Sequence, residues 1–528
     1  MTELLVTLFL PIVGALTLLF INKEQTNLIK RGALLFSVGT FLVSLLLLLK
    51  FNPLNPQIQL YYEAIWVPTL DAGFRIGLDG MSMLLVLLTT FISPIAIYAS
   101  FEPIKKRQKE YYIMMLLLQF AMTGVFVAMD LFLFYIFWEL ILIPMYFIIG
   151  IWGGKDRIYA TVKFFIFTMV GSLFMLVGII WLGSFVGSNL AFMPHGFTTN
   201  YLTISQYSLF IPLEYQKWLF WAFALSFLIK VPLFPLHTWL PDAHTEAPTA
   251  GSVILAGVLL KMGTYGLIRY NLELFPQASF QFASLISWFA VIGIIYGALV
   301  AMVQSDVKRL VAYSSVSHLG FVVLGIFSMT VEGLQGAIIQ MVNHGLSTGM
   351  LFLCVGVLYE RRHTREIEEF GGIARIMPVF TVFFAIAMLA SVGLPGLNGF
   401  IGEFLTLLGA FKSPFLKSIW YTIFAATGVI FAAVYLLWMF RRVMFGTVTN
   451  HANLALKDIN KREWATLLPV VVFIVWIGVY PSSFLHISEN STKKLVNKLE
   501  LIKFGKQRYD LPEIPEIKQN QQIKSNNQ

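Results

Sequence analysis

Residues 228–241 read LIKVPLFPLHTWLP, an apolar run that contains three prolines and one lysine. Proline lacks a backbone N–H and clashes with the preceding helical turn, so a helix must break here. A second stretch, GLPGLNG at residues 393–399, interrupts another apolar run. Backbone groups that are freed at membrane depth survive only where they are buried in protein or line water. Both stretches therefore predict discontinuous helices inside a membrane-embedded bundle.

The composition supports an all-α polytopic membrane protein. Hydrophobic residues make up 57% of the 528 positions and charged residues 12%, whereas soluble proteins contain about 25% charged residues. Apolar runs of about 20 residues recur, and each is long enough to cross a bilayer. Fourteen spans are predicted, at residues 2–21, 31–49, 79–100, 111–129, 131–150, 160–186, 218–240, 249–269, 282–304, 309–329, 334–358, 376–411, 418–440 and 464–486.

The two broken spans are the seventh and the twelfth, five spans apart. A unit with five crossings ends on the opposite face, so a second copy would be inverted, which is typical of transporters. The predicted parts are three spans with an interfacial hairpin (1–109), a first five-helix repeat (110–271), an inverted second repeat (272–440), a last span (441–486) and a polar extramembrane tail (487–528). We expect the tail to become ordered only against a partner.

The formal net charge of +9 is a topology signal. Most lysines and arginines in short loops follow odd-numbered spans, so the positive-inside rule places these loops in the cytoplasm and both termini on the opposite face. A nucleic-acid partner is not needed to explain the charge.

Cys354 is the single cysteine, which excludes disulfides and Cys-ligated clusters within this chain.

Three ionisable residues lie deep inside predicted spans: Glu139, Lys230 and Lys261. A charge at that depth costs about 2.5–3.5 kcal/mol even on the mildest scale, which favours a functional role. Snorkelling to the interface is the simpler interpretation for Lys163, near the cytoplasmic end of its span. It does not suit the other two lysines, and the short side chain of Glu139 cannot snorkel.

Further candidates are His318, His344 and Glu403, which follows the second break. Imidazole has an ordinary pKa of about 6.5, so it exchanges protons readily near neutral pH. Buried structural histidines and haem ligation are the alternatives, although the repeated His pairs typical of cytochrome subunits are missing. Glu403 occupies the position in the second half that Lys230 holds in the first, and capping of a half-helix is its structural alternative.

At these residues the sequence resembles a known family. Residues 230–248, KVPLFPLHTWLPDAHTEAP, together with Glu139, Lys261 and YSSVSH at 313–318, are similar to the antiporter-like membrane subunits of respiratory complex I. Relatives in multisubunit Na+/H+ antiporters share the pattern. Glu403 resembles the chain 4 type, because the other two antiporter-like subunits usually carry lysine there.

The resemblance covers residues 80–440, and the loop LYERRHTR at 358–365 is most similar to the cyanobacterial or plastid NAD(P)H–quinone oxidoreductase. It implies a proton-translocating subunit in a thylakoid membrane, linked to photosynthetic electron transport and plastoquinone. The partners would be other membrane-arm and peripheral-arm subunits and membrane lipids. NAD(P)H or ferredoxin, iron–sulfur clusters and quinone would be bound by those subunits, with no cofactor or metal on this chain. The implied proton path comprises Glu139, Lys230, Lys261, His318, His344 and Glu403.

The expected mechanism is electrostatic. Ionised Glu139 favours the protonated form of Lys230; if Glu139 is neutralised or withdraws, burial favours the neutral amine and the proton moves towards Lys261 and Glu403. Electron transfer elsewhere in the complex would supply the free energy. Two alternatives remain open: a subunit of a Na+/H+ antiporter, and a scaffold whose polar side chains only lock helices together.

Overall fold

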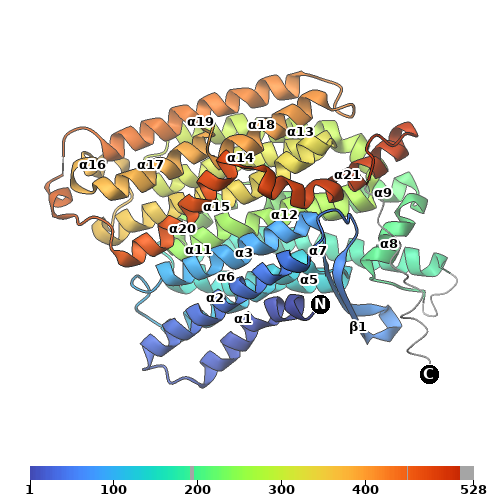
Figure 1. The fold of residues 1–528 in the computed structure, drawn as a ribbon, viewed down its shortest axis with the longest axis horizontal. Helices are drawn as coiled ribbons and strands as arrows, with labels where there is room; N and C mark the ends of the chain where they lie inside the picture. The colour runs from blue at the N-terminus through green and yellow to red at the C-terminus, as the bar shows by residue number, and fades with distance from the viewer. Residues whose placement is uncertain (191–195, 449, 512–528) are drawn as a thin grey trace.

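The computed structural model describes residues 1–190, 196–448 and 450–511. The chain is a bundle of long helices with one small two-stranded sheet at its side (Figure 1). Twelve helical segments of the described chain are long and apolar enough to cross a membrane. They are α1 (Thr2–Phe20), α2 (Thr26–Lys50), α3 (Gly80–Ala99), α4 (Gln108–Val127), α5 with α6 (Leu131–Leu140 and Leu142–Trp152), α7 (Arg157–Asn189), α11 to η4 (Thr249–Leu272), α13 (Pro276–Met302), α14 (Val307–Ser328), α15 (Val331–Arg362), α19 (Trp420–Met444) and α20 (Lys461–Val479).

Two further crossings are broken helices. The first consists of α9 (Leu213–Lys230) and α10 (Trp239–Glu246), and the second of α17 (Pro378–Val392) and α18 (Asn398–Lys412). With the twelve unbroken segments they give the fourteen crossings that the sequence predicted. Each broken helix is the fourth crossing of its five-helix group, α4 to η4 or α13 to α19, so the two groups match in the position of the break.

Polar contacts satisfy the backbone at both breaks. In the first, the Trp239 indole N–H donates to the carbonyl of Ile229 at 2.9 Å. In the second, Asn343 of α15 donates to the carbonyl of Asn398 at 2.7 Å, and Asn398 donates back to the carbonyl of Asn343 at 3.3 Å. Gly393 has φ +84°, which a residue with a Cβ rarely adopts. These contacts explain how helices can end at membrane depth.

The expected hairpin is formed by β1 (Gln59–Val67) and β2 (Ala72–Leu78), which pair antiparallel. Arg75 of β2 is buried and contacts the carboxylates of Asp71 at 2.6 Å and Asp130 at 2.8 Å. Asp130 also caps the N-terminus of α5 by accepting from two backbone N–H groups. The hairpin is therefore fixed to the start of the helix that carries Glu139.

Helix α21 corrects one prediction. Residues 487–528 were expected to form a tail that only a partner would order, but up to Phe504 they belong to α21 (Ser482–Phe504), which packs on α3 and α15. Leu495 and Leu499 of this helix are buried. The apolar face is narrow and lies among Lys and Asn residues, which is why it resembles a solvated tail. Of the rest of the predicted tail, residues 505–511 follow this helix and 512–528 lie outside the described residues.

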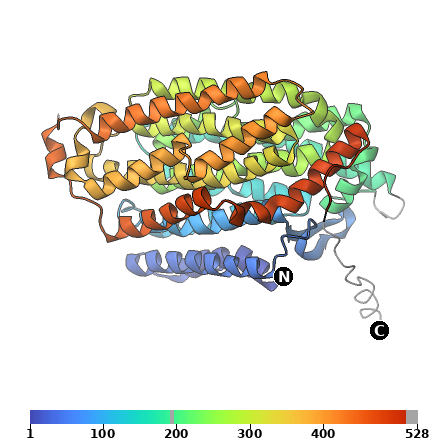
Figure 2. The same ribbon diagram turned by 45° about the horizontal axis from the view of Figure 1, so that its top comes forward.

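The outer helices are visible in Figure 2. There α1 and α2 (dark blue) lie side by side at one edge of the bundle, and α20 and α21 (red) run across it. The shorter elements are α8 (Tyr201–Tyr207), α16 (Ile373–Ile376), η1 (Pro68–Leu70), η2 (Ser208–Phe210), η5 (Ile367–Glu369) and η6 (His451–Ala455).

Candidate functional site

The first group of predicted residues lies at the first broken helix. Lys230, the last residue of α9, is 1% exposed, and its Nζ has no hydrogen-bond partner among the described residues. This atom lies 4.3 Å from the ring centroid of Trp138 on α5. The adjacent Glu139 carboxylate is close enough to interact electrostatically with Lys230, yet its Oε1 also lacks a partner in the described chain. The two charges are thus neighbours without forming an ion pair.

The second group forms a row of contacts across four helices. Lys261 Nζ on α12 lies 2.8 Å from Nδ1 of His344 on α15. The rings of His344 and His318, the latter on α14, have centroids 6.0 Å apart. His318 Nδ1 lies 2.8 Å from Oε1 of Glu403 on α18. Four of the six predicted residues therefore lie in one continuous row, and each is at most 3% exposed.

Two uncharged residues complete this row. The Gln340 amide donates to Glu403 Oε1 at 3.2 Å, and Tyr435 Oη lies 3.4 Å from His318 Nε2. Sequence reasoning missed both, because a glutamine or a tyrosine in an apolar span carries no charge that would mark it. The contacts orient the carboxylate and the imidazole, which matters because proton transfer requires close and aligned partners.

Lys261 lies in an irregular helix. The crossing comprises α11 (Thr249–Ile254), the π-helical turn η3 (Leu255–Leu259), α12 (Leu260–Gly266) and a second π-helical turn η4 (Leu267–Leu272). Lys261 Nζ donates to the carbonyl of Ala256 in η3 as well as contacting His344. π-Helical turns are rare and frequently occur at functional sites, and here one lies on each side of the buried lysine.

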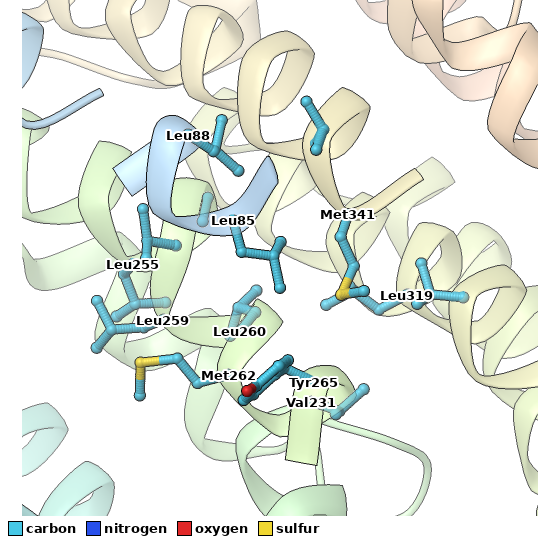
Figure 3. Packing of buried hydrophobic residues seen from close by; sticks show 14 of the residues in the cluster. Leu85, Leu88, Val231, Leu255, Leu259, Leu260, Met262, Tyr265, Leu319 and Met341 are labelled. Atoms are coloured by element: carbon cyan, nitrogen blue, oxygen red, sulfur yellow. The ribbon is translucent and has the colours of Figure 1, made fainter. Parts of the chain in front are cut away.

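The two groups are not joined to each other. Neither a hydrogen bond nor an ion pair links Lys230 with Lys261 in the described part of the chain. Figure 3 shows apolar side chains gathered at this part of α12, among them Val231, Leu260 and Met262. The chain neighbours of both lysines, Val231 beside Lys230 and Leu260 and Met262 beside Lys261, are thus apolar and buried.

A further buried histidine was missed by sequence reasoning. His244 of α10 is 0% exposed, and neither ring nitrogen has a partner in the described structure. Its ring stacks on Phe352 with centroids 4.6 Å apart. Phe352 also lines a cavity of about 110 Å³, together with Glu246 and Lys308 of the loops predicted to be cytoplasmic. The signal that could have found His244 is its position in the same broken crossing as Lys230, 14 residues further on.

Lys163 does not simply snorkel. Its Nζ lies 2.7 Å from Oδ2 of Asp242 on α10, and the backbone N–H of Asp156 donates to the Glu246 carboxylate at 2.9 Å. Lys308 donates to the carbonyl of Ala247 at the end of the same half-helix. The interpretation of Lys163 as an interfacial side chain was therefore incomplete, because this residue helps to fix α10.

The described residues contain no cluster of three or more His, Cys, Asp or Glu side chains that could hold a metal ion. Among the candidate residues, Lys230 and Glu139 are neighbours, and the others form the row of Lys261, His344, His318 and Glu403. Such an arrangement can accept, pass on and release protons between adjacent groups.

Comparisons with known proteins identify the class. Residues 128–431 match the family described as NADH:quinone oxidoreductase/Mrp antiporter, transmembrane. Residues 5–125 match the amino terminus of NADH-ubiquinone oxidoreductase chain 4. NADH-quinone oxidoreductase subunit M of Rickettsia conorii is 45% identical over 93% of this chain and 98% of its own. NADH-ubiquinone oxidoreductase chain 4 of Marchantia polymorpha is 42% identical over 93% of this chain and 96% of its own.

Solved structures agree. A chain of respiratory complex I from Thermus thermophilus, in a structure with bound NADH, superposes with a TM-score of 0.83 at 32% identity, covering 93% of this chain and 99% of that one. A chain of the Mrp complex from Dietzia reaches a TM-score of 0.81 at 18% identity, over 95% and 99% of the two chains, and so shares the fold. The chain belongs to the antiporter-like membrane subunit family of complex I, in its subunit M or chain 4 branch.

Proposed function

We propose that this chain carries protons across the membrane as a membrane-arm subunit of a complex I-type NADH–quinone oxidoreductase, driven by electron transfer in other subunits. The row Lys261, His344, His318 and Glu403 is the observation that carries the proposal. A scaffold needs polar contacts between helices, but it does not need every member of a buried row to be ionisable.

Each step of the row suits proton transfer. The contacts between Lys261 and His344 and between His318 and Glu403 are both 2.8 Å, short enough for direct transfer. Imidazole can accept a proton on one nitrogen and release one from the other. The 6.0 Å between the two imidazole centroids is crossed by ring rotation or through a water molecule.

Uptake from the cytoplasmic side is assigned to His244. This imidazole stacks on Phe352, which lines the cavity together with Lys308, and it is close enough to Lys261 and His344 to interact electrostatically with both. A buried polar group needs a partner, and transient water from the cavity would supply one. His244 would then deliver protons to Lys261 and His344.

In this proposal Glu139 and Lys230 form a control element, which means that their charge states determine when protons move along the row. A change in the charge of Glu139 alters the charge that Lys230 keeps, because Lys230 is buried and electrostatic interactions are strong at low dielectric. A change of charge on Lys230 then alters the electric field at the row. Transfer along the row is thereby coupled to events at the first broken helix.

The partners and the host membrane follow from the relatives. NADH or another reductant, iron–sulfur clusters and quinone belong to the other membrane-arm and peripheral-arm subunits in this proposal. Sequence reasoning favoured a thylakoid membrane, plastoquinone and photosynthetic electron transport. The names of the relatives, NADH-quinone and NADH-ubiquinone oxidoreductase, favour a respiratory membrane instead, and we propose that host.

The test is NADH-driven proton uptake by inverted vesicles that contain the assembled complex. Lys261→Gln removes the ionisable group at the start of the row, so proton uptake and coupled turnover should fall about a hundredfold. Lys498→Gln, on α21, is the matched control and should pump normally. Full pumping by Lys261→Gln would refute the proposal. Pumping that requires sodium in place of choline would instead support the antiporter alternative.

A further inference from the structure

We infer that Trp138 is a positioning residue for the proton on Lys230, and that its indole face holds the ammonium while Glu139 stays out of direct contact. This inference rests on the proposed function, since it assigns a part to a residue beside the control element. It starts from the contact between Lys230 Nζ and the Trp138 ring centroid, 4.3 Å apart.

The indole face of Trp138 is an electron-rich surface beside a cation that has no hydrogen-bond partner in the described chain. Lys230 Nζ forms no hydrogen bond within the described residues, and both Lys230 and Trp138 are 1% exposed. A cation over the face of tryptophan is attracted by the ring quadrupole, most strongly where water is excluded. The contact therefore stabilises the ammonium form of Lys230 relative to the neutral amine.

The ring is held in place by aromatic neighbours. Phe227, on the same helix as Lys230, packs edge-on against Trp138 with centroids 5.3 Å apart and an interplanar angle of 72°. Phe134, one turn earlier on α5, lies 5.5 Å away. The indole N–H of Trp138 has no hydrogen-bond acceptor in the described chain. The ring is thus oriented by packing, and the group it presents to Lys230 is its face.

The chemistry of an aromatic face differs from that of a carboxylate. A carboxylate in direct contact with Lys230 could take the proton itself and leave a neutral pair. An indole face favours the ammonium but cannot accept its proton. Trp138 and Glu139 are successive residues of α5, so a single turn presents both groups near Lys230. Trp138 would keep the proton on Lys230 until the charge of Glu139 changes.

Fluorinated tryptophans at position 138 test this role. One, two or three fluorine atoms on the indole progressively weaken the attraction of the ring face for a cation, and they change the shape of the side chain very little. In the intact complex in vesicles, the logarithm of the NADH-driven pumping rate should fall steadily with the number of fluorines, by about tenfold over the series. The same series at Trp464, a partly exposed residue of α20, should have no effect. Equal pumping across the series at position 138 would overturn the inference.

Variants with natural amino acids at position 138 test the same role of the ring face. Trp138→Phe keeps a weaker aromatic face and loses no hydrogen bond, so pumping should lie between that of wild type and Trp138→Leu. If Trp138→Leu fails to assemble, the fluorinated series alone decides. Lys230→Ala distinguishes the role of Trp138 from the role of Lys230 itself. Loss of pumping in Lys230→Ala with a flat fluorine series would remove only the role of Trp138, whereas normal pumping in Lys230→Ala would also remove the control role that the proposed function gives to Lys230.

Discussion

The two broken helices hold their ionisable residues in opposite ways. At α9 and α10, Lys230 and Glu139 have buried polar atoms without hydrogen-bond partners in the described chain, and Lys230 rests on the face of Trp138. At α17 and α18, Glu403 is bonded to His318 and to Gln340. An unpartnered charge responds strongly to a nearby change of charge, whereas a bonded row passes protons between neighbours. The comparison indicates that the first broken helix controls proton transfer and that the second conducts the protons.

The largest effect should follow from Lys230, because it is the single cation of the first group. Lys230→Ala should leave assembly intact and reduce pumping and coupled turnover about a hundredfold. Lys230→Arg should fail almost as badly, since a guanidinium hardly releases its proton. Vesicle assays at matched amounts of complex measure both. Full pumping by the arginine variant would mean that a fixed charge suffices and that the first group does not exchange protons.

A smaller effect is expected at His244, which belongs to neither group and which we propose as the point of proton uptake. His244→Gln keeps a polar side chain that cannot carry a proton, so pumping should fall about tenfold while other uptake routes through water persist. His451→Gln, at an exposed histidine of η6, serves as the control. Unchanged pumping in the His244 variant would show that protons reach Lys261 by another route.

The smallest effect is expected at Tyr435, whose hydroxyl contacts His318 of the second group. Tyr435→Phe removes the hydroxyl that lies 3.4 Å from His318 Nε2, and the loss of one such bond should slow pumping about threefold. Tyr421→Phe, on the same helix, removes a hydroxyl that contacts Ser284 at 2.6 Å instead. The two variants should differ in pumping but not in assembly. Equal rates would exclude Tyr435 from orienting His318.

Sequence reasoning could identify the charged residues but not their connections. Lys230, Lys261 and Glu403 stand out because charges are rare in apolar spans. The contacts of the row join residues 83 and 85 positions apart in sequence, and such distances follow only from helix packing. Spacing therefore could not show that Lys261 contacts His344, whereas the Lys230 Nζ has no hydrogen-bond partner in the described chain.

The missed residues share a physical reason. His244 lies in a half-helix whose sequence is rich in polar residues, so a single histidine there resembles a loop residue. Helix α21 has a mean composition close to that of a soluble tail, and only its packing on α3 and α15 reveals its buried face. Pattern arguments detect apolar periodicity and rare charges, and both signals are weak in these two segments.

Glu403→Gln tests the central claim most directly, because it preserves size and hydrogen bonding while removing the ability to ionise. The account predicts that the assembled variant loses pumping about a hundredfold, with Glu403→Asp and Glu403→Lys retaining intermediate rates because each can still exchange a proton. NADH-driven proton uptake should be measured in vesicles at equal amounts of complex. Wild-type pumping by Glu403→Gln would contradict the account, because the row would then stabilise the bundle without conducting protons.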